Sequence, residues 1–115
     1  TNGDYPMVEK FKRDGMVAII ISPGFGAGWS TWNADIAEFL LFDKTLVQYC
    51  KDGADITLVR DYIYSKFDDA NDYVSLGGWE QADIRWLDEG THFSINDYDG
   101  SESVQVRDDE YWRIA

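Results

Sequence analysis

Residues 22–32 carry the residue types best suited to binding chemistry, and they read Ser-Pro-Gly-Phe-Gly-Ala-Gly-Trp-Ser-Thr-Trp. Three glycines in five positions allow backbone shapes that other residues rarely adopt. The stretch connects a predicted strand to a predicted helix, where backbone N–H groups can hold a phosphate or another anion. A tryptophan there could stack on a base, and the hydroxyls could donate hydrogen bonds. The candidate ligand-binding residues are therefore Gly24, Gly26, Gly28, Trp29, Ser30, Thr31 and Trp32.

The loop matches neither of the common nucleotide-binding motifs. No lysine stands between Gly28 and Ser30, so the loop is not a P-loop. Its glycines follow the pattern G-x-G-x-G, and the second half of the chain lacks the parallel β-α-β pattern of a dinucleotide fold. Two interpretations stay open: a structural turn that lets the tryptophans pack, and a surface that binds a ligand or partner.

Few other side chains could act in catalysis or metal binding. His92 is the one histidine, and a lone histidine makes a poor metal site. Cys50 falls on the apolar face of a predicted helix, where cysteine packs as a small hydrophobe. Residues 97–102 match half of an EF-hand loop, but its first and twelfth positions would be apolar. With sixteen aspartates, no particular carboxylate pair can be nominated for hydrolysis. The sequence therefore predicts no catalytic residue, metal site or cofactor.

The acidic charge lies mostly in the second half of the chain. The whole chain has a net charge of -12, of which residues 1–67 contribute -2 and residues 68–110 contribute -11. Such a surface repels nucleic acid and anionic membranes and attracts basic proteins. Acids on a twisted sheet could repeat at the spacing of phosphates on a duplex. The candidate partner-binding residues on this acidic surface are Asp88, Glu89, Asp97, Asp99 and Glu102.

The spacing of apolar residues predicts an α+β fold. The run at 16–21 is typical of a buried strand, and it precedes the glycine-rich loop. Apolar residues at helical spacing predict one helix, or two broken near Asp43, ending at Gly53, and a further helix over 55–67. Alternation then predicts strands at 82–87, 91–96 and 103–106, with a possible further strand at 74–76. We therefore expect two helices packed on a C-terminal antiparallel β-meander of four or five strands.

Length and composition favour a single domain over residues 1–115. A chain this long can bury one hydrophobic core. We expect a loose segment over 1–15, a strand with helices over 16–67 and the acidic meander over 68–115. One cysteine allows no intrachain disulfide, and no run approaches the roughly 20 apolar residues of a membrane span. No signal peptide is evident, so we expect a cytoplasmic protein.

Two motifs carry a resemblance to known proteins. Residues 21–33 read ISPGFGAGWSTWN, and residues 86–102 read WLDEGTHFSINDYDGSE, preceded by Gly77-Gly78. Together with the helices between them, they resemble a group of small bacteriophage and mobile-element proteins over roughly residues 16–106. The resemblance implies a phage-type accessory protein in the cytoplasm of an infected bacterium, and it implies no catalytic residues.

These observations favour binding over catalysis. The first hypothesis is a non-catalytic accessory protein whose acidic, nucleic-acid-mimicking surface inhibits a basic protein of the host or of an anti-phage defence. It predicts a nucleic-acid-binding protein as partner, with no direct contact to nucleic acid or membrane. The alternative is a protein that binds or sequesters a small nucleotide signal through the glycine loop. The third is a small enzyme that depends on carboxylates or a metal.

Overall fold

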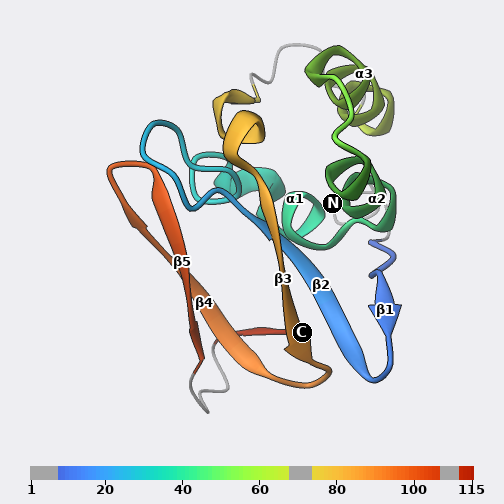
Figure 1. Ribbon diagram of the computed structural model, residues 1–115, viewed down its shortest axis with the longest axis vertical. Coiled ribbons are helices and arrows are strands. Elements are labelled where there is room, and N and C mark those ends of the chain that lie inside the picture. The colour runs from blue at the N-terminus through green and yellow to red at the C-terminus, as the bar shows by residue number, and fades with distance from the viewer. Residues whose placement is uncertain (1–7, 68–73, 107–111) are drawn as a thin grey trace.

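Two antiparallel sheets and three α-helices make up the computed structural model, which describes residues 8–67, 74–106 and 112–115 (Figure 1). The first sheet has the order β1-β2-β3 and the second the order β5-β4-β6. The predicted α+β class is confirmed. The strands are β1 (Lys12–Arg13), β2 (Met16–Ile21), β3 (Asp83–Asp88), β4 (His92–Tyr98), β5 (Ser101–Val106) and β6 (Arg113–Ile114).

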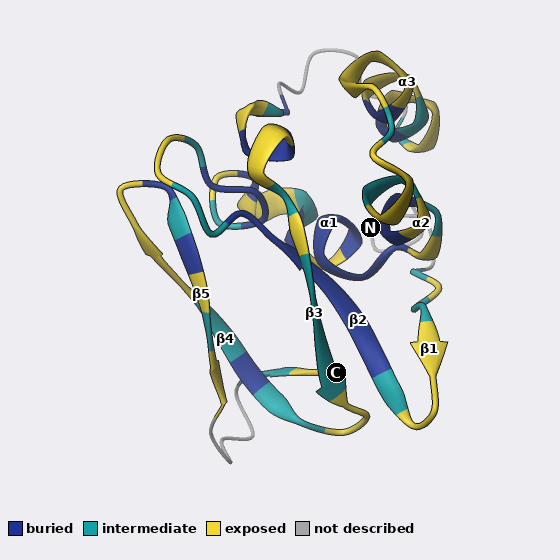
Figure 2. Cartoon of the chain, in the orientation of Figure 1, coloured by how far each residue is buried: buried dark blue, intermediate teal, exposed yellow. Residues whose placement is uncertain are grey.

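Strand β2 lies between two layers of side chains, which explains its unbroken apolar sequence. Ala18 and Ile20 on one face pack in a cluster with helix residues. Val17, Ile19 and Ile21 on the other face pack with residues of α1 and of the second sheet. Successive side chains of a strand point to opposite faces, so a strand covered on both faces has no polar alternation. The first sheet is therefore covered on both faces, by helix residues on one and by residues of α1 and the second sheet on the other. Figure 2 shows β2 buried along most of its length.

The helices begin and end at residues that the sequence indicates. The helices α1 (Ala37–Phe42) and α2 (Lys44–Asp52) are separated at Asp43, whose side chain accepts a hydrogen bond from the Leu46 N–H at 3.1 Å. Gly53 ends α2 in the left-handed conformation, with a φ of 68°. Asp55 caps α3 (Ile56–Lys66) by accepting from the Thr57 N–H at 2.8 Å. Of the two alternatives that the spacing allowed, the structure has two helices separated at Asp43, and the predicted stop at Gly53 and the helix start near Asp55 are confirmed.

The predicted meander does not form one sheet. Strand β3 pairs with β2 over its whole length, from Met16 opposite Asp88 to Ile21 opposite Asp83, and it belongs to the first sheet. Strand β4 pairs with β5 and β6 instead. Residues 74–76 form no strand and lead into the 3-10 helix η3 (Gly77–Gln81). The alternation of apolar and polar residues predicts where the strands lie. It does not predict which strands pair, because pairing depends on contacts between residues far apart in the sequence.

The β4–β5 hairpin matches its prediction. Its turn is Asp99-Gly100, with φ values of 52° and 82°. Two successive positive φ values make a type I′ turn, whose twist suits a two-residue hairpin. The register then runs from Tyr98 opposite Ser101 to Phe93 opposite Val106.

The expected loose segment over 1–15 is ordered where the structure describes it. Lys12–Arg13 form β1, which pairs with β2 through the turn Asp14-Gly15. Two basic side chains of this segment lie over aromatic rings, with Lys10 Nζ 4.5 Å from the Phe42 centroid and Arg13 Cζ 4.6 Å from the Trp86 centroid. They cover the core here, which the sequence pattern did not indicate.

Within residues 8–67, 74–106 and 112–115, we find no helix whose length and apolar content would let it cross a membrane.

Candidate interaction site

The glycine loop lies against the β4–β5 turn, so two sites predicted separately from the sequence form one. The Gly26 N–H donates to the Asp99 carbonyl at 3.4 Å, and the Glu102 N–H donates to the Ser22 carbonyl at 2.8 Å. The Ser101 hydroxyl donates to the Pro23 carbonyl at 2.6 Å. Figure 1 shows the two loops side by side, at the end of the hairpin away from β6.

Glu102 lies at the centre of this contact and is only 2% exposed. Its Oε1 accepts from the Ser22 N–H at 2.8 Å, and its Oε2 accepts from the N–H groups of Trp29 at 2.8 Å and Thr31 at 3.0 Å. The Thr31 hydroxyl also lies 2.7 Å from Oε2. The loop therefore holds an anion, as its glycines suggested, and this anion is the protein's own carboxylate. Glu102, one of the acids predicted to contact a partner, is instead buried and hydrogen-bonded to the glycine loop.

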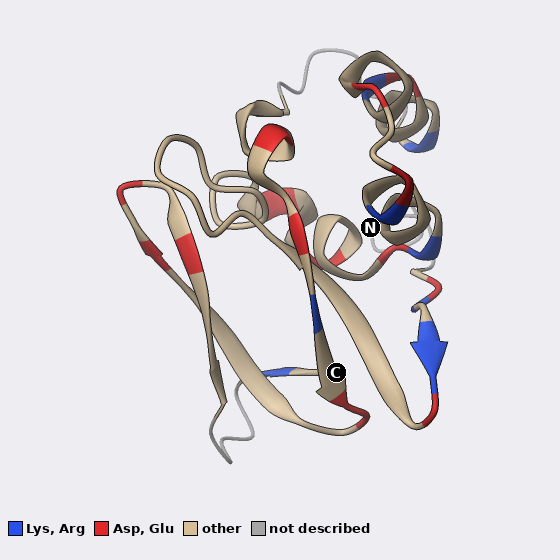
Figure 3. Cartoon of the chain, viewed as in Figure 1, with Lys and Arg blue, Asp and Glu red and all other residues tan. Residues whose placement is uncertain are grey.

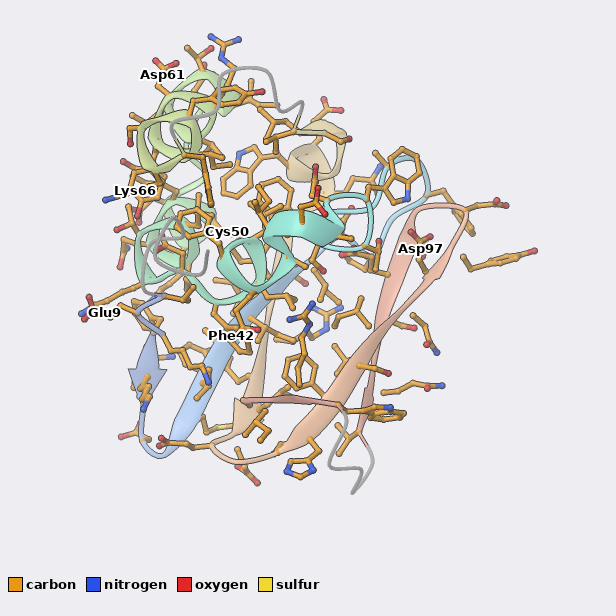
Figure 4. The ribbon with its side chains drawn as sticks, turned by 180° about the vertical axis from the view of Figure 1, so that it is seen from behind. Glu9, Phe42, Cys50, Asp61, Lys66 and Asp97 are labelled. Carbon is orange, nitrogen blue, oxygen red and sulfur yellow. The ribbon has the colours of Figure 1, made fainter. Side chains whose placement is uncertain are left out.

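Asp97 holds the outer part of the same loop. Its Oδ2 lies 2.7 Å from the Thr31 hydroxyl and accepts from the Trp32 Nε1–H at 2.7 Å, while its Oδ1 accepts from the Gly100 N–H at 2.6 Å. Burial raises the pKa of Asp97, but the hydrogen bonds from Thr31, Gly100 and Trp32 outweigh burial and lower the pKa below its usual value. Asp97 therefore carries its negative charge at neutral pH. Figure 4 shows it near the end of the hairpin, beside the loop.

Two of the glycines are needed because side chains and backbone approach them closely. A Cβ on Gly28 would overlap the Thr31 hydroxyl and the Trp32 ring. A Cβ on Gly100 would overlap the carbonyl group of Gly26. Packing against Asp97 and the hairpin thus requires glycine at both positions.

The two loop tryptophans have different surroundings. Trp29 is fully buried, donates from Nε1 to the Leu40 carbonyl at 2.8 Å, and has its ring centroid 5.5 Å from that of Trp79. Trp32 is 50% exposed. Ser30 is buried and lines a groove of about 480 Å³ between α1 and β4. Trp29 therefore packs in the core, and Trp32 is available to a partner.

Exposed aromatic side chains gather on these two loops. Phe25 is 71% exposed and Tyr98 is 74% exposed, in addition to Trp32. Large aromatic side chains on a fixed surface are typical of binding sites, because each offers contact area at a small entropic cost. We call this surface the tip, and it consists of Phe25, Trp32, Asp97, Tyr98 and Asp99.

The acids of the tip, Asp97 and Asp99, form no ion pair with a lysine or arginine of residues 8–67, 74–106 or 112–115. Acids elsewhere do form such pairs, for example Arg113 with Glu38 at 2.7 Å. The tip therefore presents uncompensated negative charge beside aromatic rings.

The other predicted acidic residues lie far from the tip. Asp88 is exposed at the end of β3, and Glu89 follows it in the turn before β4. Glu89 forms an ion pair with Lys12 at 2.8 Å, which lowers the pKa of Glu89. Figure 3 shows acidic residues near the β4–β5 turn and in the turn between β3 and β4, and between Glu89 and Asp97 strand β4 carries no acidic residue. The five predicted acids do not form one continuous surface.

The remaining candidate groups lie elsewhere. Cys50 is half-buried beside Trp79 and Ala82, and burial, followed by the charge of Asp83, raises the pKa of its thiol to about 11. His92 is half-buried at the start of β4. Over the part of the chain that the structure describes, no three His, Cys, Asp or Glu side chains are grouped so that they could hold a metal ion.

The contact of Asp97 and Glu102 with the glycine loop could have been anticipated from the alternation. Asp97 follows Phe93 and Ile95 at spacing two, and Glu102 precedes Val104 at the same spacing. Both therefore fall on the apolar face of the hairpin. A charged residue on such a face indicates a carboxylate held by hydrogen-bond donors, and here Glu102 is buried whereas Asp97 stays exposed.

Comparison of the chain with models of protein families, with curated proteins and with solved structures found no match in any of the three. The resemblance to small phage proteins stays a prediction that rests on its two motifs. Function must therefore be argued from the tip itself.

Proposed function

We propose that this chain is a binding protein that docks through its tip on a basic surface of a protein partner. The observation that supports this function is the set of three exposed aromatic side chains, Phe25, Trp32 and Tyr98, on the same two loops as two carboxylates that form no ion pair with a described lysine or arginine. Aromatic contact area would supply affinity, and the negative charge would steer association with a basic partner.

The fixed geometry of the loop favours docking over loop rearrangement. The hydrogen bonds to Glu102 and Asp97 hold the backbone and the Trp32 ring in place before any partner arrives. A preorganised surface loses less conformational entropy on binding, and its affinity is correspondingly higher.

The proposed partner class is a nucleic-acid-binding protein of a bacterial host or of its defence. Such proteins carry the basic surfaces that bind phosphates. A net charge of -12 favours this class over nucleic acid itself. Occupying such a surface would inhibit the partner.

The nucleotide-binding alternative loses its main support. Phosphate binding would need the N–H groups of the loop, and those of Ser22, Trp29 and Thr31 already donate to Glu102. A nucleotide would have to displace a buried carboxylate, and its own charge would be repelled by Asp97 and Asp99.

Affinity capture from bacterial lysate with matched variants tests the proposal. The parent protein is compared with Asp99→Asn and Tyr98→Ser at the tip and with Asp88→Asn at the end of β3, away from the tip. We expect a basic protein that the parent and Asp88→Asn retain at low salt, and that the two tip variants retain several-fold less. Retention that is equal for all variants, or lost only with Asp88→Asn, would show that the tip is not the docking surface.

A further inference from the structure

The ring of Trp32 is held at one edge and is half exposed. Its Nε1–H donates to Asp97 Oδ2 at 2.7 Å, and the ring packs against Gly28, while half of its surface stays accessible. The indole therefore has a fixed orientation beside a charged carboxylate. A fixed, accessible indole next to a negative charge is a favourable surface for a cation, which is attracted both by the ring and by the carboxylate.

Acceptor positions at the tip remain open. Asp97 Oδ1 accepts one hydrogen bond from Gly100 N–H, and a carboxylate oxygen can accept two. The Asp99 side chain is exposed, and no hydrogen bond or ion pair joins its carboxylate to another described residue. A ligand with several N–H donors in one plane could use both carboxylates while lying on the Trp32 face.

A guanidinium group fits these requirements better than an ammonium group. It is planar, stacks on aromatic faces and presents five donors in a rigid fork, whereas ammonium is a compact and strongly hydrated point charge. Nucleic-acid bases would also stack on an indole, but their phosphates would meet the charges of Asp97 and Asp99. Charge complementarity therefore favours a protein side chain over a nucleotide.

We propose that the tip binds an arginine side chain of the partner, with the guanidinium stacked on Trp32 and donating to Asp97 and Asp99. This inference rests on the proposed docking function and names the group that the tip recognises. The arginine would be the anchor of the interface, and Phe25 and Tyr98 would supply apolar contact around it.

Peptide titration of the ¹⁵N-labelled protein tests the assignment without a known partner. The probes are acetyl-Gly-Arg-Gly-amide, its lysine analogue and its citrulline analogue, which keeps the planar shape but lacks the charge. The chain has five tryptophans, so the Trp32 indole N–H is identified as the signal that Trp32→Phe removes. Amide signals of residues 97–100 report on the hairpin turn.

The expected result is a saturable shift of the Trp32 indole and the 97–100 amides with the arginine peptide. The lysine peptide should bind about two- to fivefold more weakly, and the citrulline peptide should give no saturable shift. Asp99→Asn should weaken arginine binding about two- to fivefold, and it keeps the turn because asparagine also accepts positive φ. The matched control Asp61→Asn, on α3 and distant from the tip, should leave the affinity unchanged (Figure 4).

Several outcomes would overturn the assignment. If the lysine or citrulline peptide bound as tightly as the arginine peptide, the tip would not recognise guanidinium. Signal shifts spread over the whole surface, or no shift at millimolar peptide, would also contradict arginine binding at the tip. A saturable shift of the Trp32 signal with a single-stranded oligonucleotide would show that the ligand of the tip is a nucleic-acid base and not an arginine side chain. Tip-dependent capture of a protein together with a negative peptide titration would retain the docking function and reject arginine. Saturable arginine-peptide binding without tip-dependent capture of a protein would reject the docking function and retain the arginine site.

Discussion

Asp97 and Glu102 lie directly opposite each other on β4 and β5, so two carboxylates are cross-strand neighbours. Like charges at such positions destabilise a sheet unless other groups compensate. The glycine loop supplies this compensation, because Thr31 places its hydroxyl 2.7 Å from both side chains and its N–H on Glu102. A hydroxyl has one proton and donates to one carboxylate at a time, so the backbone N–H groups are essential. The loop and the acid pair thus stabilise each other.

Replacing Glu102 by glutamine should strongly destabilise the fold, although the two side chains have nearly the same shape. The amide NH₂ would face loop N–H groups that now donate to a carboxylate oxygen, which leaves buried donors without acceptors. We expect a loss of about 2–4 kcal/mol in the free energy of unfolding, measured by urea denaturation. The control Glu80→Gln, at an exposed position in η3, should change it by less than about 0.5 kcal/mol. Equal midpoints for the two variants would contradict the role of Glu102.

The lowered pKa of Asp97 predicts a loss of stability in acid. Because its folded pKa lies below the ordinary value of 3.8, its contribution is fully present above that value and is lost as the pH falls through the folded pKa. The Tm of the parent protein should therefore fall more steeply below about pH 4 than that of Asp97→Asn. Parallel Tm curves for the two proteins between pH 5 and pH 2.5 would show that Asp97 contributes no such dependence.

Two glycines with similar backbone conformations should respond differently to alanine. Gly53 and Gly100 have φ values of 68° and 82°, but only Gly100 has other atoms where a Cβ would stand. Gly53→Ala should cost about 1 kcal/mol of backbone strain. Gly100→Ala should cost a further 1–3 kcal/mol, roughly, because the Gly26 carbonyl must move. Chemical denaturation of both variants measures the difference in the free energy of unfolding. Equal losses for the two variants would mean that the Gly26 carbonyl moves aside without a measurable cost.

The Cys50 thiol should react slowly in the folded protein. Burial, followed by the charge of Asp83, raises its pKa to about 11, so little thiolate forms near pH 8. Labelling with a disulfide reagent at pH 8 should be at least about a hundredfold slower than in urea, where the pKa returns to about 8.5. Asp83→Asn should raise the folded rate modestly. Similar rates with and without urea would show that the thiol is neither desolvated nor protected.

Local chemistry made the helices and the hairpin predictable from the sequence. Asp43 and Asp55 begin helices because their short carboxylates accept hydrogen bonds from the first turn, and Gly53 ends one because it adopts positive φ. The Asp99-Gly100 turn follows from the same local preference. Each of these features depends on residues within four positions of one another.

Pairing over long distances in the chain could not be predicted in this way. The apolar strand β2 needed a neighbour on each edge, and the alternation at residues 83–88 does not say whether it pairs with β2 or β4. The same limit applies to the site. The sequence indicated separately a loop that could hold an anion and a turn rich in acid, but their contact spans more than 70 residues.

The contact between Ser22 and Glu102 also fixes when the tip can form. Ser22 and Glu102 are 80 residues apart, and Glu102 belongs to the last hairpin strand to be translated. While the chain is on the ribosome, the loop N–H groups have no Glu102 to accept from them until that strand has emerged. A nascent or prematurely terminated chain that lacks residue 102 therefore cannot hold the loop through this contact, and the tip is complete only in a chain that extends through the hairpin.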